Sequence, residues 1–284
     1  MPVNAADVKR LREITDAPMM ECKAALEEAN GDMDRAQEIL REKGKAAAAK
    51  RADRATAAGN VFIALSEDRK KVAGIVVESE TDFVALNETF RSIVQQIGEA
   101  VLAHAPAGAT TESVLGLSAG GQTIGEILEG AVGTIRENIK LTDAVVLTST
   151  AGVFSSYVHH DRKAGAIVEI ETPSAEVAAG KNVAMQIVAF PPTYLAKTEV
   201  PQDAIDAEIR VEKERAMNEG KPAEMAEKIA MGRINKEYFQ KVVLLEQPFI
   251  LDDKKSVDQY LAEEGKAAGG TIKILSYRSL RVGG

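Results

Sequence analysis

The sequence predicts an α+β fold in which a small helical unit precedes a core of two subdomains, each with a short antiparallel sheet and helices. Two patterns support this. Apolar residues recur at helical spacing over residues 5–44, and from Gly59 onward they alternate with polar residues as they do in strands. With 284 residues the chain is long enough to form more than one packed unit.

Residues 1–44 are expected to form three helices. The apolar stripe of the first helix consists of Val8, Leu11 and Ile14. Asp16 can cap the second helix, and Asn30-Gly31 supplies a left-handed stop at its end. Asp32 then starts the third helix, which we expect to end at Gly44. The polar, alanine-rich residues 45–58 are interpreted as a linker.

The core is divided into residues 59–140 and residues 141–284. In the first part, strands are expected around Val61–Leu65 and 71–79, followed by helical spacing from Phe83 to Leu102 and over 122–139. The second part contains three further strand candidates and a helix, at Ala144–Thr148, Val153–Val158, Ala164–Glu171 and about 175–189. Each part therefore combines a sheet with helices.

A highly charged segment at about 203–241 has both signs interspersed and only narrow apolar stripes. The break at Glu219-Gly220-Lys221-Pro222 predicts two antiparallel helices that project from the body. Packing as one more pair of core helices is the alternative. A projecting arm could serve self-association, as a homodimer or a two-plus-two assembly with a partner, or a secondary contact with that partner.

Composition excludes several classes of function. The formal charge of −8 argues against nucleic acid as the main partner. The single cysteine, Cys22, excludes an intrachain disulfide and a cysteine-rich zinc site. Neither a signal peptide nor a membrane-spanning run is evident, so a cytoplasmic location is expected. Nucleotide-binding fingerprints are absent, and we expect no cofactor and no resident metal.

One corner of the predicted core stands out. The apolar run Val72–Val77 leads into Glu78-Ser79-Glu80 and then Thr81-Asp82-Phe83-Val84, after which helical spacing begins. An aromatic ring thus lies next to an acid where a strand meets a helix, and such corners on rigid scaffolds commonly carry function. Periodicity alone favours a core position for Phe83, which is in phase with Phe90 and Ile97.

Five segments resemble the elongation factor Ts family in order and spacing. They are Val8–Glu13 with Met19–Leu26, Glu80–Ala85, Ser156–His159 with Gly165–Val168, Gly220-Lys221-Pro222, and Leu244–Phe249. The resemblance covers nearly the whole chain. It implies a three-helix N-terminal domain of the ubiquitin-associated (UBA-like) shape and a guanine-nucleotide exchange factor, not an enzyme, whose partner is the GTPase elongation factor Tu.

The resemblance also implies the site. Asp82 and Phe83, within the signature Thr81 to Val84, would meet the GTPase near its nucleotide and loosen its magnesium and phosphate contacts. Magnesium demands near-ideal octahedral geometry, so a small shift can weaken nucleotide binding several-fold. The other expected partner contacts are Met19, Met20, Arg12, Lys23 and His159.

Three segments depart from the family pattern. Thr15-Asp16-Ala17-Pro18 replaces a Thr-Gly-x-Gly turn, Leu86 takes the place of a lysine, and Arg136 replaces the glycine of Ile-Gly-Glu-Asn. The first departure puts the docking angle of the N-terminal unit in doubt. None of them changes Asp82 or Phe83.

Three competing interpretations remain. His159-His160-Asp161 could suggest a metal site, but adjacent strand residues point to opposite faces, which separates the two histidines. Gly116–Gly120 matches the G-x-S-x-G elbow of a serine hydrolase with Ser118 as nucleophile, yet the residues before it are too polar for a buried strand. A ubiquitin-associated adaptor would explain only the first forty residues.

Overall fold

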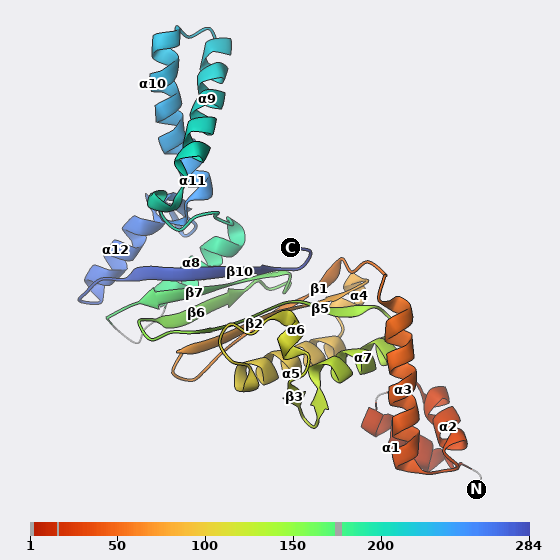
Figure 1. Cartoon of the computed structure of the whole chain (residues 1–284). Helices are drawn as coiled ribbons and strands as arrows, with labels where there is room; N and C mark the ends of the chain where they lie inside the picture. The colour runs from red at the N-terminus through yellow and green to blue at the C-terminus, as the bar shows by residue number, and fades with distance from the viewer. Residues whose placement is uncertain (1–2, 16, 174–177) are drawn as a thin grey trace.

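The computed structural model describes residues 3–15, 17–173 and 178–284. Two three-stranded antiparallel sheets pack against each other at the centre of the molecule, and helices cover their outer faces (Figure 1). The strand order of the first sheet is β1 (Ala58–Leu65), β2 (Lys71–Ser79), β5 (Ile139–Thr148). The order of the second is β10 (Lys273–Arg281), β7 (Ala164–Glu171), β6 (Val153–Val158). The predicted α+β class is confirmed.

Strand β2 is buried on both faces, which explains its continuous apolar run. Ile75 and Val77 point toward the helices, whereas Val72 and Val76 contact the second sheet. Gly74 lies on the same side as the latter pair. A Cβ there would lie 2.4 Å from Cδ1 of Leu280, so glycine is what allows the two sheets to approach.

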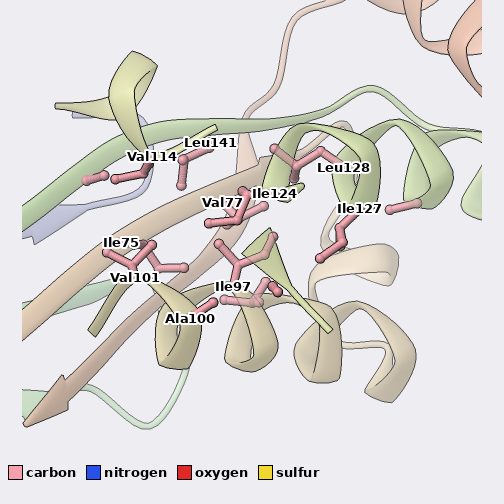
Figure 2. Close-up of a cluster of buried hydrophobic side chains, with 14 of the residues drawn as sticks. Ile75, Val77, Ile97, Ala100, Val101, Val114, Ile124, Ile127, Leu128 and Leu141 are labelled. Carbon is pink, nitrogen blue, oxygen red and sulfur yellow. The ribbon is translucent and has the colours of Figure 1, made fainter. Parts of the chain in front are cut away.

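The helices of the first subdomain cover the outer face of its sheet. They are α4 (Asp82–Ala85), α5 (Glu88–His104), α6 (Thr111–Val114) and α7 (Ile124–Ile135), with the short hairpin β3 (Ser118–Ala119) and β4 (Gln122–Thr123) between the last two. Figure 2 shows Ile97 and Val101 of α5 and Ile124 and Leu128 of α7 meeting the sheet residue Val77 in one cluster. This layer gives the first subdomain its hydrophobic core.

The second subdomain is built in the same way on the other sheet. Helix α8 (Ala178–Ala189) packs on β7 and β6, and α12 (Val257–Ala267) packs beside α8 in the same hydrophobic cluster. The short strands β8 (Pro248–Phe249) and β9 (Asp252–Ser256) precede α12. The single-turn helix η1 (Lys197–Glu199) follows α8 in the chain, and η3 (Leu244–Glu246) precedes β8. The start of the helix predicted at 175–189 lies partly outside the described residues.

Two sequence-based assignments in the core are wrong. The strand expected at 144–148 was grouped with the second subdomain, but β5 pairs with β2 and closes the first sheet. The helix expected over 122–139 ends at Ile135, because Arg136 adopts a left-handed conformation and Ile139 already begins β5. Strand pairing joins residues far apart in the chain, so periodicity identified the strand but not its sheet.

The N-terminal unit contains the three predicted helices, α1 (Ala5–Thr15), α2 (Met19–Glu28) and α3 (Met33–Arg51). Asn30 and Gly31 have positive φ of 52° and 87°, and the carboxylate of Asp32 accepts hydrogen bonds from two backbone amides of α3. Ile14 does not continue the buried stripe, since its side chain is 53% exposed. The expected cap, Asp16, lies outside the described residues.

The prediction that the third helix ends at Gly44 is wrong. Helix α3 continues to Arg51 and crosses α7 at a pair of glycines. A Cβ on Gly44 would lie 3.3 Å from the carbonyl oxygen of Glu129, and a Cβ on Gly133 would lie 3.1 Å from Cα of Gly44. Gly44 therefore permits close helix packing, and the segment between helix and sheet is shorter than expected.

The predicted antiparallel arm is confirmed. Helices α9 (Gln202–Asn218) and α10 (Ala223–Arg233) extend side by side away from the second subdomain, with Gly220 at a φ of +81° in the reversal (Figure 1). A π-helical turn, η2 (Ile234–Tyr238), and α11 (Phe239–Val242) return the chain to the body. No helix among residues 3–15, 17–173 and 178–284 is long and apolar enough to cross a membrane.

Candidate partner-binding site

The corner after β2 is a tight turn that presents Phe83 to solvent. β2 ends at Ser79, and Thr81 caps the single-turn helix α4 by accepting a hydrogen bond from the Val84 amide at 3.4 Å. This turn directs the Phe83 ring outward, and 88% of its side chain is exposed. A core position for Phe83 is thereby excluded. Val84 instead turns inward and packs against the core of the first subdomain.

The carboxylate of Glu137 fixes the start of this turn through two hydrogen bonds. One carboxylate oxygen accepts a hydrogen bond from the Thr81 hydroxyl at 2.6 Å, and the other accepts one from the Thr81 amide at 3.0 Å. Both bonds go to an ionised acceptor, which makes them stronger than neutral hydrogen bonds. The position of Thr81 is thus fixed relative to the end of α7.

Further hydrogen bonds hold both ends of the corner. Glu80 accepts from the Asn138 amide at 2.7 Å and pairs with Arg54 at 3.3 Å, while the Asn138 side chain donates to the Arg54 carbonyl at 2.6 Å. At the far end, the buried Asn60 side chain donates to the Ala85 carbonyl at 2.7 Å. The backbone of the turn is therefore rigid although its central side chain is free.

The turn between β6 and β7 lies next to this corner. Lys163 in that turn pairs with Asp82 at 2.8 Å, and the hydrogen bond to Asp82 raises the pKa of the Lys163 ammonium. His159 begins the same turn, and its Nδ1 lies 3.0 Å from Asp161. Burial raises the pKa of Asp161, but hydrogen bonds from the Lys163 amide and His159 outweigh that effect and leave it below its usual value. The structure thus places His159 in the turn whose Lys163 contacts Asp82.

The expectation that His159 and His160 point to opposite faces of a strand is wrong. Strand β6 ends at Val158, so both histidines lie in the turn, where their ring centroids are 4.2 Å apart. Even so, no group of three or more histidine, cysteine, aspartate or glutamate side chains in the described part of the chain is arranged to hold a metal ion.

Comparison with known proteins shows that most of the chain resembles one protein family. A family model described as Elongation factor TS matches residues 80–284. Elongation factor Ts of Chloroherpeton thalassium is 40% identical over 99% of this chain and 98% of its own length. The protein of the same name from Aquifex aeolicus is 39% identical over 93% of this chain and 94% of its own.

The chain belongs to the elongation factor Ts family. It is accordingly a translation elongation factor that acts in nucleotide exchange on elongation factor Tu, and it is not an enzyme. The hydrolase alternative also lacks structural support. Ser118 lies exposed in the two-residue strand β3, ahead of Gly120 and Gly121, and no buried strand leads into it as a nucleophile elbow requires.

The other predicted contacts lie on the N-terminal unit, apart from the corner. Met19 and Met20 at the start of α2 are 48% and 72% exposed, which confirms that they do not both face a core. Arg12 on α1 is exposed, and Lys23 on α2 forms only a loose pair with Glu27 at 3.7 Å. The predicted partner contacts therefore lie on two separate surfaces of the chain.

Sequence reasoning missed several residues that support the corner, among them the buried Asn60. Glu137 and Asn138 belong to a segment that resembles a family motif, but the sequence alone indicates no role for their side chains. No sequence pattern marks Lys163 as functional, since a lysine in a charged turn is typical of an ordinary solvent-exposed position. Of the departures from the elongation factor Ts pattern, Leu86 is 61% exposed beside Phe83 and adds apolar surface to the corner.

Proposed function

We propose that this chain releases GDP from elongation factor Tu by inserting Phe83 next to the nucleotide site. One observation supports this above the others: an almost fully exposed aromatic ring on a turn whose backbone is fixed at both ends. Rigid presentation lowers the entropy lost on binding. Aromatic side chains that become buried on binding supply much of the binding energy of an interface.

The neighbouring side chains would act with the ring. Asp82 pairs with Lys163, and His159 pairs with Asp161 in the same turn, so a carboxylate and an imidazole from two neighbouring segments can compete for polar contacts in the GTPase. Displacing groups around the magnesium ion and the phosphates weakens nucleotide binding, because magnesium tolerates little distortion. Thr81 and Val84 are half-buried and would shape the contact from the base of the turn.

The N-terminal unit would form the second contact. Methionine side chains adapt to irregular partner surfaces, and Met19 and Met20 provide exposed apolar area on α2. Arg12 and Lys23 would pair with carboxylates of the GTPase. In this proposal the helical unit, the two subdomains and the arm are separate functional parts of the chain.

The arm is the proposed site of any self-association, as a homodimer or a two-plus-two assembly. Its exposed apolar side chains are Val211, Met217, Met225 and Met231. We further propose that the protein acts in the cytoplasm, where its GTPase partner works, and that exchange requires neither nucleic acid nor a cofactor held by this chain.

Release of fluorescent GDP from elongation factor Tu tests the proposal. We expect substoichiometric amounts of the chain to accelerate release. Thermodynamic linkage requires that GDP weaken binding of the chain by the same factor by which the chain weakens GDP binding. A complex that is equally tight with and without GDP would contradict exchange by destabilisation of the nucleotide.

A further inference from the structure

The end of helix α7 has an unusual residue in its cap. Arg136 follows the helix with φ of 69° and ψ of 19°, the left-handed conformation that disfavours side chains with a Cβ. Helices commonly end in this conformation with glycine, which has no Cβ to oppose it. A strained residue that persists needs a compensating interaction.

The arginine side chain supplies that interaction. Its guanidinium pairs with the carboxylate of Glu21 on α2, more than a hundred residues earlier in the chain. Glu21 lies directly after Met20, so the pair joins the end of α7 to the helix that carries the proposed N-terminal contacts. A glycine at position 136 would leave Glu21 without this partner.

The N-terminal unit otherwise contacts the core mainly through one helix crossing. Helix α3 meets α7 where Gly44 and Gly133 touch, and the flanking pairs Arg41–Glu126 and Lys45–Glu129 are long, at 3.9 and 3.8 Å. A cleft of about 920 Å³ lies between the N-terminal unit, chiefly α3 and the end of α1, and helices α5 and α7, with Glu21 and Arg136 both in its lining. A single crossing point permits rotation, which a second attachment across the cleft would prevent.

The residues after Arg136 hold the other contact surface. Glu137 binds Thr81 and Asn138 binds Glu80, so three consecutive residues at the end of α7 connect to the N-terminal unit and to the Phe83 corner. The two surfaces that would meet the GTPase are thereby joined through one short segment.

We propose that Arg136 is a positioning residue that fixes the N-terminal unit relative to the Phe83 corner, so that both reach elongation factor Tu together. This inference rests on the proposed function of the two surfaces. Linking two contacts in the correct geometry raises the effective concentration of the second after the first has formed. The strained conformation of Arg136 lowers the stability of the fold, and the orientation gained strengthens binding.

Two variants separate strain from orientation. Arg136→Gly relieves the strain and removes the pair, whereas Arg136→Ala removes the pair and keeps the strain. We expect both to raise the half-saturating concentration in GDP release about two- to fivefold, the range for an exposed ion pair, with an unchanged maximal rate. Only the glycine variant should unfold at a higher temperature.

Arg69→Gly is the matched control. Arg69 also has a positive φ, of 56°, but it lies in the turn between β1 and β2, away from the N-terminal unit. It should raise the unfolding temperature without changing the half-saturating concentration. Exchanging the charges, Glu21→Arg with Arg136→Glu, should restore much of the binding that Arg136→Glu alone loses.

A distance measurement tests the orientation without the GTPase. Spin labels at Lys9→Cys on α1 and Glu112→Cys on α6 would report the distance between the N-terminal unit and the core, while Cys22 is buried. We expect a narrow distribution in the parent chain and a broader one in Arg136→Gly. Unchanged distributions together with an unchanged half-saturating concentration would overturn the role of Arg136. Failure of the parent chain to release GDP would refute the proposed function while leaving the distance result valid.

Discussion

The Phe83 corner and the α9–α10 arm both project from the body, but they are held in different ways. The corner is a single turn fixed by hydrogen bonds to half-buried and buried groups, among them Glu137 and Asn60. The arm is held by contacts within itself: Ala216, Ala226 and Ala230 are buried between its helices, and Arg233 lies 3.1 Å from Glu212 and 2.7 Å from Glu219. Its base contains a π-helical turn.

The difference indicates separate roles. A side chain that must displace groups in a partner needs a rigid support, and the corner receives its support from the core of the first subdomain. The arm packs mainly on itself and on the base cluster of the second subdomain, so it does not support the corner. We therefore expect changes at the corner to alter the exchange step and changes in the arm to leave it intact.

The largest expected effect comes from Phe83→Ala. A central aromatic anchor contributes about 2–4 kcal/mol to an interface, which corresponds to a loss of about 30- to 1,000-fold in exchange efficiency. The unfolding temperature should not change, because the ring makes few contacts within the chain. GDP-release kinetics and thermal unfolding measure the two quantities.

Phe90→Ala serves as the control for Phe83→Ala, because it should lower stability and leave the activity of the folded protein unchanged. Phe90 is fully buried in α5, so its truncation should lower the free energy of unfolding by about 3–5 kcal/mol while the folded fraction keeps its activity. If Phe83→Ala behaved in this way instead, the ring would have a structural role and the exchange proposal would fail.

A smaller loss is expected for Glu137→Ala, which removes both hydrogen bonds to Thr81 and leaves Phe83 in place. Bonds to a charged acceptor contribute about 1.5–3 kcal/mol each to stability, and we expect about 1.4 kcal/mol of this to be lost from binding as the turn loosens, so exchange should fall by about tenfold. Hydrogen exchange of the Thr81 amide should accelerate in parallel. Full activity with an unprotected Thr81 amide would show that rigidity of the corner is unimportant.

Deleting residues 1–51 should weaken binding by about tenfold and leave the core folded, since the exposed methionines of α2 are lost and the corner remains. Circular dichroism and gel filtration assess folding, and titration of GDP release assesses binding. The surface of α7 that α3 covers becomes exposed in this variant. Aggregation of the remainder would show that the helical unit and the core form one cooperative structure.

The smallest effect is expected from the arm. Replacing residues 211–233 by a short Gly/Ser link should change the maximal rate of GDP release by less than about twofold, because α9 and α10 lie side by side at that level and make no contact with the corner. The cut keeps Ile209 and Ile234, which pack in the cluster at the base. A collapse of the maximal rate in a variant that still folds and binds would assign the arm to the mechanism.

Local patterns predicted much of this structure. The capping residue Asp32, the stop at Asn30-Gly31, the five predicted strands and the reversal at Gly220 depend on residues close in sequence, and each is confirmed. Strand β10 was not predicted. The exposure of Phe83 was expected only from family resemblance, since its spacing with Phe90 is equally compatible with burial.

Errors arose where a signal had two physical meanings or where partners were distant. A glycine in a helix either ends it or permits a close crossing, and only the position of Gly133 shows that Gly44 does the latter. The assignment of β5 to the first sheet depends on pairing with β2, about seventy residues away. Lys163 could not be linked to Asp82 without knowing that two turns from different sheets meet.

The position of β10 near the end of the chain determines when folding can be completed during synthesis. It pairs with β7, with Lys273 opposite Glu171, and it places Leu280 between the two sheets next to Gly74. Just beyond it, the Gly283 amide donates to Glu78 at 2.9 Å, shortly before the Phe83 corner. During synthesis on the ribosome, β1, β2 and β5 can pair before β10 is made. The face of this first sheet around Gly74 stays exposed until Leu280 has emerged and can cover it. Any translation product that stops before β10 would carry the complete Phe83 motif on an unfinished body, and we expect proteolysis to remove it before it can compete for the GTPase.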